Sequence, residues 1–319
     1  MTDIHTNLNM GNLQSQNNLD YYNLAELLSN EGLVTPENLV TELNGRLAPD
    51  DYLGLSVAAL NSFQPKEPQT DEAGVVDFED LHVLLEPGYS SLLEHGYAKR
   101  KDGTLYVAVL SDLGSEVTPE MLDWWFSQCD NGDKHRWWHP RAHQGACAFD
   151  PPFYAAMAFE RPPQHYVGHV QTVEERIGGG SHTLRYEYLR PNRFLDMRGV
   201  EEGVVLARLH LDHPRYGSMA LGYVAHIIRQ VDGRTELRSR VWLGDFFFEE
   251  TPENYYVAQA LTRLANTPLL RSMHLSASLA QQVYSQLGQK MQCLRAFLPA
   301  YYAQAQREQE NLLSSFQFN

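Results

Sequence analysis

The chain has few cysteines and no long apolar run. Its three cysteines, Cys129, Cys147 and Cys293, show no CxxC spacing, which excludes a disulfide framework and a cysteine-rich zinc site. No stretch approaches the roughly 20 apolar residues of a membrane-spanning helix. Residues 1–30 are polar and lack the basic and apolar regions of a secretory signal. We therefore expect a cytoplasmic protein.

Positive charge is also scarce. The 319 residues include 25 Lys and Arg against 40 Asp and Glu, a net charge of −15. Because no Lys/Arg run and no basic helix face occurs, we expect neither nucleic acid nor an anionic membrane as partner. A hydrophobic content of 43% is ample for a core. We therefore expect a small molecule as the partner. The sequence leaves open whether the protein forms a homodimer.

The pattern of elements predicts an α+β fold. We expect a disordered lead over 1–20, an N-terminal helical extension over 21–100, and the main domain over 101–319. The extension would contain helices at 21–30, 36–46 and 78–97. Apolar and β-branched runs predict strands at 104–110, 166–176, 181–189, 204–212, 219–231 and 234–244.

Turn residues join several of these strands. Gly178-Gly179-Gly180 and Asp232-Gly233 are hairpin signals, and successive hairpins make an antiparallel meander. Helices follow Thr118-Pro119 and Thr251-Pro252, and a long amphipathic helix covers 276–297, ahead of Pro299. Strands in series before a long helix predict an antiparallel sheet with helices on one face.

The segment 124–143 concentrates residues that form binding sites. It holds four tryptophans together with His139 and His143, four residues apart. Imidazole transfers protons near neutral pH and binds metals, while indole gives large, stiff apolar walls. The segment predicts a pocket for an aromatic or polycyclic small molecule. The alternative is an aromatic core cluster with two satisfied histidines.

Five separated stretches carry a family resemblance. They are 123–126 (DWWF), 138–143 (WHPRAH), 173–179 (VEERIGG), 236–244 (ELRSRVWLG) and 297–302 (FLPAYY). In order and approximate spacing the region 104–302 resembles the 2,4-diacetylphloroglucinol hydrolase family, which includes phloretin hydrolase. The resemblance implies a Bet v 1-like helix-grip fold, a curved antiparallel sheet around a long C-terminal helix. It also implies zinc-dependent hydrolysis of the carbon–carbon bond between an acyl group and an electron-rich aromatic ring.

The resemblance further implies a zinc site of two histidines and two glutamates. His143 matches the first ligand, and Glu174 is the expected second, with Glu175 as the alternative. The HxxxE pair that relatives carry on the long helix falls on Gln286 and Lys290. Gln is a poor zinc ligand, and an ammonium group is none. A metal is therefore not favoured; if zinc is retained, His143 and Glu174 would hold it.

Lys290 is expected to face inward. Val283, Gln286, Lys290, Cys293 and Phe297 recur at spacings of three and four, which is one face of a helix. Since burying a lone ammonium is costly, Lys290 needs a partner, for which Glu174 or Glu175 is available. We expect this pair to stand where relatives hold the metal. In the alternative, Lys290 extends to solvent from the helix edge.

The candidate site residues are assigned to two roles. The predicted catalytic residues are His143, Glu174, Lys290 and His226. The predicted substrate-binding residues are His135, Trp138, His139, Gln286, Arg238 and Arg240. Arg238 and Arg240 share a strand face and could hold an anionic or enolic oxygen. For each of these the alternative is an ordinary core or rim residue.

The sequence thus predicts a metal-independent cyclase or lyase of secondary metabolism. Its substrate would be a hydrophobic, oxygenated polyketide, phenol or terpenoid. Lys290 and His143 would donate to a carbonyl group, oriented by Glu174. Two alternatives stay open: a zinc-dependent carbon–carbon hydrolase with replacement ligands, and a protein that binds a metabolite without turnover.

Overall fold

A computed structural model describes residues 49–86, 88, 91–128, 132–150, 166–177, 179–195, 203–213 and 217–317. The predicted lead over 1–20 and the predicted helices at 21–30 and 36–46 lie outside these residues. Among the described residues no helix is long and apolar enough to cross a membrane.

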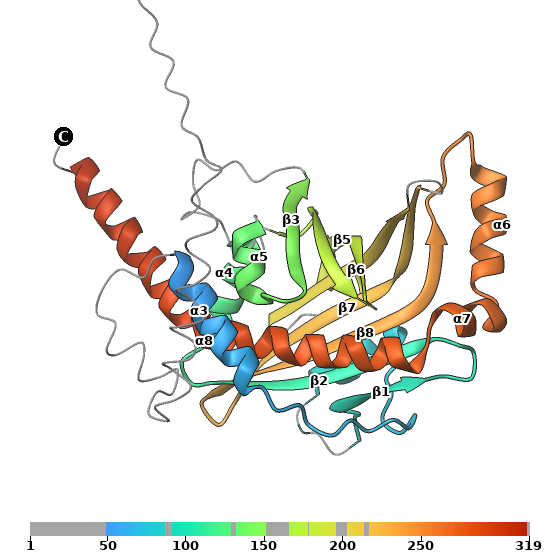
Figure 1. The fold of residues 1–319 in the computed structure, drawn as a ribbon, viewed down its shortest axis with the longest axis horizontal. Coiled ribbons are helices and arrows are strands. Elements are labelled where there is room, and N and C mark those ends of the chain that lie inside the picture. Colours follow the sequence, from blue (N-terminus) through green and yellow to red (C-terminus); the bar gives the residue numbers. More distant parts are fainter. Residues whose placement is uncertain are drawn as a thin grey trace, which may run out of the picture.

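An eight-stranded antiparallel sheet forms the body of the structure. Its strand order is β1-β2-β8-β7-β6-β5-β4-β3. The strands are β1 His95–Lys99, β2 Leu105–Gly114, β3 His143–Asp150, β4 Val170–Ile177, β5 Gly180–Leu189, β6 Gly203–His213, β7 Gly217–Val231 and β8 Arg234–Phe248. The sheet curves around one side of a long C-terminal helix (Figure 1). The predicted α+β helix-grip class is confirmed.

The hairpin signals lie where strands reverse. Asp232 and Gly233, with φ of 50° and 75°, connect β7 to β8. Positive φ at both central residues is what a two-residue hairpin requires, and Asp and Gly tolerate it. Gly179, with a φ of 83°, lies between β4 and β5, where Ile177 pairs with Gly180.

Helix α8, Ala277–Gln317, is longer than the pattern predicts. It continues past Pro299, where we expected it to end. Proline removes one backbone hydrogen bond from a helix interior. Phe297, Leu298 and Ala300 are all buried around it, so their packing holds the helix through this point.

The segment before β1 also differs from the prediction. In place of a helix over 78–97, a 3₁₀ helix η1 covers Phe78–Leu85 and β1 begins at His95. Side chains alternate in burial along β1, the period of a strand. β1 pairs with β2 in one sheet, so the boundary we placed between 100 and 101 falls inside a hairpin.

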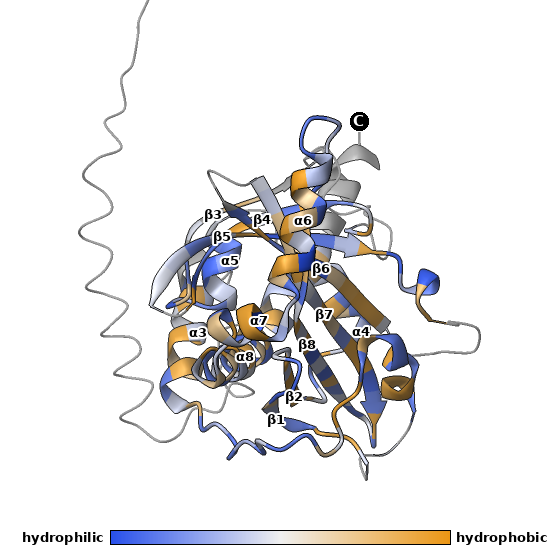
Figure 2. Cartoon of the chain, turned by 90° about the vertical axis from the view of Figure 1, so that its right-hand side faces the viewer, coloured by the Kyte–Doolittle hydropathy of each residue, from blue (hydrophilic) through white to orange (hydrophobic). Residues whose placement is uncertain are grey.

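Two cores cover the two faces of the sheet. The larger lies on the concave face, under α8, with contributions from helices α3 Pro49–Ser62, α4 Pro119–Gln128 and α5 Gly132–Trp138. The smaller lies on the convex face, where η1 and its flanking segments pack. Helices α6 Tyr255–Ala265 and α7 Pro268–His274 lie at one end of the sheet (Figures 1 and 2).

Candidate functional site

A cavity of about 640 Å³ lies between α8 and the concave face of the sheet. Its wall is mainly aliphatic and aromatic, with side chains from β3 to β8 and from α4 to α8. Two lining residues, His182 on β5 and His274 on α7, have exposed side chains, so the cavity opens between these elements. A large apolar cavity with a few polar groups is the usual form of a small-molecule site.

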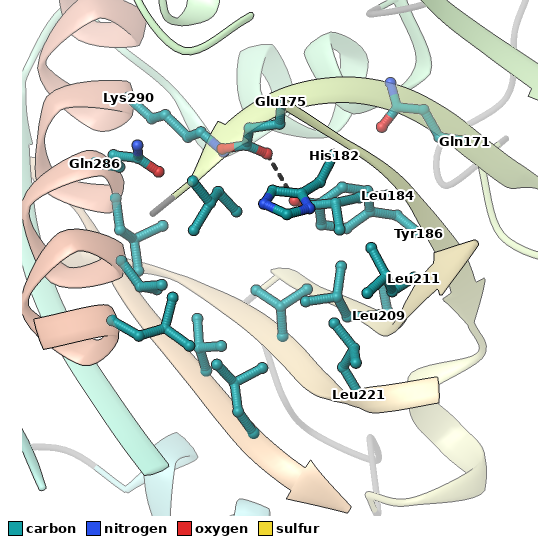
Figure 3. A pocket seen from close by; sticks show the side chains of 18 of the residues that line it. Gln171, Glu175, His182, Leu184, Tyr186, Leu209, Leu211, Leu221, Gln286 and Lys290 are labelled. Carbon is teal, nitrogen blue, oxygen red and sulfur yellow. Dashed lines mark hydrogen bonds and ion pairs between the residues drawn. The ribbon is translucent and has the colours of Figure 1, made fainter. Parts of the chain in front are cut away.

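An ion pair forms the polar end of the cavity. The Lys290 Nζ of α8 lies 2.6 Å from Glu175 Oε1 of β4, and their side chains are 11% and 2% exposed. The Tyr186 hydroxyl of β5 donates to Glu175 Oε2 at 3.2 Å. Figure 3 shows Lys290 and Glu175 meeting above the aliphatic wall. Charge-assisted bonds of this kind are the strong ones.

Two histidines stand beside this pair. His143 Nε2 is 3.6 Å from Glu175 Oε1, and the His143 and His135 rings lie 3.6 Å apart, centroid to centroid. The Lys290 Nζ also lies 5.7 Å from the centre of the Trp138 ring. Among the described residues, neither the ring nitrogens of His143 nor the Trp138 indole N–H has a hydrogen-bond partner. A buried polar atom without a hydrogen-bond partner carries a free-energy cost, which distinguishes these two side chains from the satisfied polar groups around them.

Burial fixes the charges at the polar end. It lowers the pKa of His143 to about 4, reinforced by the nearby Lys290 charge, and lowers the pKa of His135 well below its usual value. Burial alone would raise the pKa of Glu175, but Lys290 and then His143 hold it well below its usual range. At neutral pH the site therefore contains neutral imidazoles around one ammonium–carboxylate pair.

His226 lines the cavity from β7. Its Nδ1 lies 2.8 Å from Ser239 Oγ, and its ring stacks on Phe126 at 5.5 Å. Burial, followed by the Lys290 charge, lowers the pKa of His226 to about 3. The side chain is therefore a neutral, oriented imidazole facing the ligand space.

Gln286 and His139 border the polar end differently. Gln286 lines the cavity one helical turn from Lys290, and its amide donates to the Arg176 carbonyl at 2.8 Å. His139 is buried outside the lining: its Nδ1 accepts from the Ala142 N–H, and its Nε2 meets Gln289 Oε1 at 2.9 Å. His139 supports the turn that presents His143, and it does not line the cavity.

The structure corrects the choice between adjacent glutamates. Glu174 is exposed, and its side chain lies over Gly145, where a Cβ would collide with it. Glu175 pairs with His143 across β3 and β4, and paired residues project to the same face. Because successive strand residues alternate faces, Glu175 reaches the cavity and Glu174 cannot.

The predicted substrate role of two arginines is also wrong. Arg238 and Arg240 are fully buried on the convex face, away from the cavity. Each donates to one carboxylate oxygen of Glu94, at 2.7 and 2.6 Å. Arg238 further donates to the carbonyls of Leu84 and Gly88. They share a face with Trp242 as predicted, but that face packs under η1.

Tyr186 is a site residue that the sequence reasoning missed. Leu184, Tyr186 and Tyr188 occupy every second position of β5, so they share one face, and all three line the cavity. Burial and then the Glu175 charge raise the pKa of Tyr186 well above its usual value, so its hydroxyl remains a donor. The period-two pattern over 181–189 contained the signal, but it did not say which face was enclosed.

A known protein family matches the greater part of this chain. The model of the DAPG hydrolase PhiG domain matches residues 75–303. The chain belongs to this family. The match includes β1 and η1, which the sequence resemblance did not reach. No curated protein matches the chain.

Solved structures of low similarity also match. Ara h 8.0201 is 10% identical, with a TM-score of 0.26, covering 53% of this chain and 97% of its own. Protein CV1439 from Chromobacterium violaceum is 15% identical, with a TM-score of 0.27 and shares of 52% and 96%. Protein Ms6760 from Mycobacterium smegmatis is 10% identical, with a TM-score of 0.26 and shares of 59% and 92%.

The family is in general zinc-dependent, and the donors of this chain do not fit that ion. The described residues contain no group of three His, Cys, Asp or Glu side chains arranged to hold a metal. The Lys290 ammonium bonds the one buried carboxylate at the polar end. A divalent ion there would meet a fixed positive charge and lose its anionic ligand.

Proposed function

We propose that this protein is a metal-independent enzyme of secondary metabolism. It would cyclise a hydrophobic, oxygenated small molecule in the cavity, or cleave a carbon–carbon bond in one. The observation that carries the proposal is the Lys290–Glu175 pair, 2.6 Å apart, at the polar end of an otherwise apolar cavity. Membership of the DAPG hydrolase family supports ketone and phenol chemistry in this space.

Lys290 would act on a carbonyl oxygen of the substrate. Its ammonium is oriented by Glu175 and reaches the cavity beside the unpartnered Trp138 N–H. Two donors at one oxygen stabilise the negative charge that develops when the adjacent carbon loses a proton. Such stabilisation is strongest where little water is present, as at the buried polar end of the cavity.

His143 would act as the base. Its pKa of about 4 keeps the ring neutral at physiological pH, and Glu175 at 3.6 Å stabilises the imidazolium formed on proton transfer. So weak a base suits an acidic C–H group, such as that between two carbonyls or on a polyhydroxylated ring. The substrate class is therefore a β-dicarbonyl or an electron-rich phenolic ketone.

A bond-forming cycle then balances without any co-reactant. His143 takes the proton from carbon, and the electron pair moves to the oxygen held by Lys290. The enolate carbon attacks a second carbonyl of the same molecule, which forms the new carbon–carbon bond. The resulting alkoxide takes the proton back from His143. The same steps in reverse cleave the bond, so these groups serve a lyase equally well.

The test is turnover of β-diketone and acylphenol substrates in the presence of EDTA. We expect wild-type protein to form a product, and Lys290→Met and His143→Ala to lose nearly all of this turnover. Lys101→Met, the same substitution on an exposed lysine, is the matched control. Binding without turnover by wild type would show a metabolite carrier instead. Activity that disappears with EDTA and returns with zinc would support the zinc hydrolase.

A further inference from the structure

Exposed apolar side chains gather at one end of the molecule. Among the described residues, all large exposed hydrophobic side chains except Phe194 lie on α6, on α7 or at the end of β8. The α6–α7 patch consists of Tyr256, Val257, Leu264, Leu269 and Met273, which are 57–83% exposed. Figure 2 shows this end face-on, with hydrophobic colouring on both helices. So concentrated an apolar surface indicates an interaction site.

Helices α6 and α7 contain no acidic residue, although the chain as a whole is acidic. Between Asn254 and Arg307 the sequence contains no Asp or Glu, although the chain has 40 of them. Within α6 and α7 the basic residues are Arg263, Arg271 and His274. Glu249, Glu250 and Glu253 precede α6, and Asp102 pairs with Arg271 at 3.4 Å. The two helices therefore present apolar side chains and the exposed guanidinium of Arg263, next to the three glutamates that precede α6.

The patch also borders the opening of the cavity. Ala265 of α6 and Leu270 of α7 line the cavity, and His274 lies at its opening. Leu269 and Met273 alternate with these residues along α7 and face outward. The two short helices thus have one side on the ligand space and the other on solvent. A lipophilic molecule could pass between the patch and the cavity with few polar contacts.

We propose that the α6–α7 patch docks on a phospholipid bilayer surface, against the expectation from the net charge of the whole chain, because the exposed apolar side chains are concentrated on these two helices. The apolar side chains would enter the boundary between headgroups and acyl chains, and Arg263 would meet lipid phosphate. The cavity would then open toward the membrane, so that a lipophilic molecule enters it from the lipid phase. The negative charge of the rest of the chain orients this end toward the bilayer. The inference does not depend on the reaction in the cavity.

Vesicle co-sedimentation of the full chain tests this docking. The probes are phosphatidylcholine vesicles and phosphatidylcholine vesicles that contain a minority of phosphatidylglycerol. We expect wild type to bind both, and the second more tightly. Leu269→Ser should weaken binding to both about tenfold, since one large apolar side chain no longer enters the lipid. Phe194→Ser, which changes an exposed aromatic residue elsewhere, should leave binding unchanged.

Charge variants add a second, independent readout. Arg263→Gln should weaken binding chiefly to the anionic vesicles, whereas Arg307→Gln, near the far end of α8, should not. Wild type that stays in the supernatant with both kinds of vesicle would overturn the proposal. So would sedimentation velocity showing a wild-type dimer that Leu269→Ser converts to a monomer, because the patch would then bind a second copy.

Discussion

Two buried charge clusters lie on opposite faces of the same sheet, and they differ in whether they border the cavity. On the convex face, both oxygens of Glu94 accept from arginines, and Arg238 also donates to two backbone carbonyls. On the concave face, Glu175 pairs with Lys290 and Tyr186, while His143 and Trp138 keep polar atoms without partners among the described residues.

This difference separates structure from function more clearly than burial or charge does. Both clusters are almost fully buried, so burial does not distinguish them. The convex cluster does not line the cavity, and the bonds from Arg238 to the Leu84 and Gly88 carbonyls tie the η1 segment to the sheet, although Arg240 Nε has no hydrogen-bond partner among the described residues. A cluster with unpartnered donors beside a cavity carries a cost that a bound molecule would remove. The Glu94 cluster therefore fastens η1 to the sheet, and the Lys290 cluster belongs to the site.

The Lys290→Met variant tests most directly whether the Lys290 cluster is needed for turnover. On the proposed mechanism, turnover should fall roughly a thousandfold, because the main stabiliser of the enolate oxygen is lost. Steady-state kinetics measures the loss. Lys290→Met also leaves Glu175 buried without its cation, so Lys290→Met/Glu175→Gln should recover thermal stability while remaining inactive. Activity in either variant near the wild-type level would remove Lys290 from the mechanism.

The Glu94→Gln variant should lose stability and keep its turnover. It leaves two buried guanidinium groups with a neutral partner, and we expect the free energy of unfolding to fall by about 3 kcal/mol. Urea titration measures this change. Turnover at low temperature, where the variant is folded, should match wild type. If turnover falls while stability does not, the convex cluster is part of the site after all.

Restoring the ligand pattern of the family tests the role of the lysine charge. Gln286→His/Lys290→Glu creates the HxxxE pair beside His143 and Glu175. We expect this double variant to bind zinc about a hundredfold more tightly than wild type. Metal analysis after dialysis against zinc provides the stoichiometry. Equal zinc content in the two proteins would show that Lys290 does not displace the ion.

The pH dependence of stability gives a further test of the buried histidines. His143 has a pKa of about 4 in the fold, against 6.5 in an unperturbed chain. The unfolded chain therefore binds more protons between these values, and the free energy of unfolding decreases as pH falls from about 6.5 to about 4. Each such histidine contributes a slope of about 1.4 kcal/mol per pH unit at most. His143→Asn should reduce the slope in urea titrations, whereas substitution of the exposed His182 by Asn should not.

Local sequence predicted the parts of the fold that local chemistry decides. Asp-Gly and the glycine run placed two hairpins, because few residues accept positive φ. The spacing of three and four along 283–297 placed Gln286 and Lys290 on the cavity side of α8, since helix periodicity alone sets that direction. Helix α8 passed its predicted end because packing around Pro299 outweighs one missing backbone bond.

The sequence by itself determined the family, the strand meander and the inward lysine. Only the tertiary structure decided which glutamate meets that lysine, and that Arg238 and Arg240 face η1 instead of the ligand space. The physical reason is that successive residues of a strand point to opposite faces of the sheet. The segments that cover each face are distant in the sequence, so the local pattern does not show which face borders the cavity. The pairing of β3 with β4 places Glu175 beside His143 on the cavity face. Ion pairs with Glu94 hold Arg238 and Arg240 on the other face.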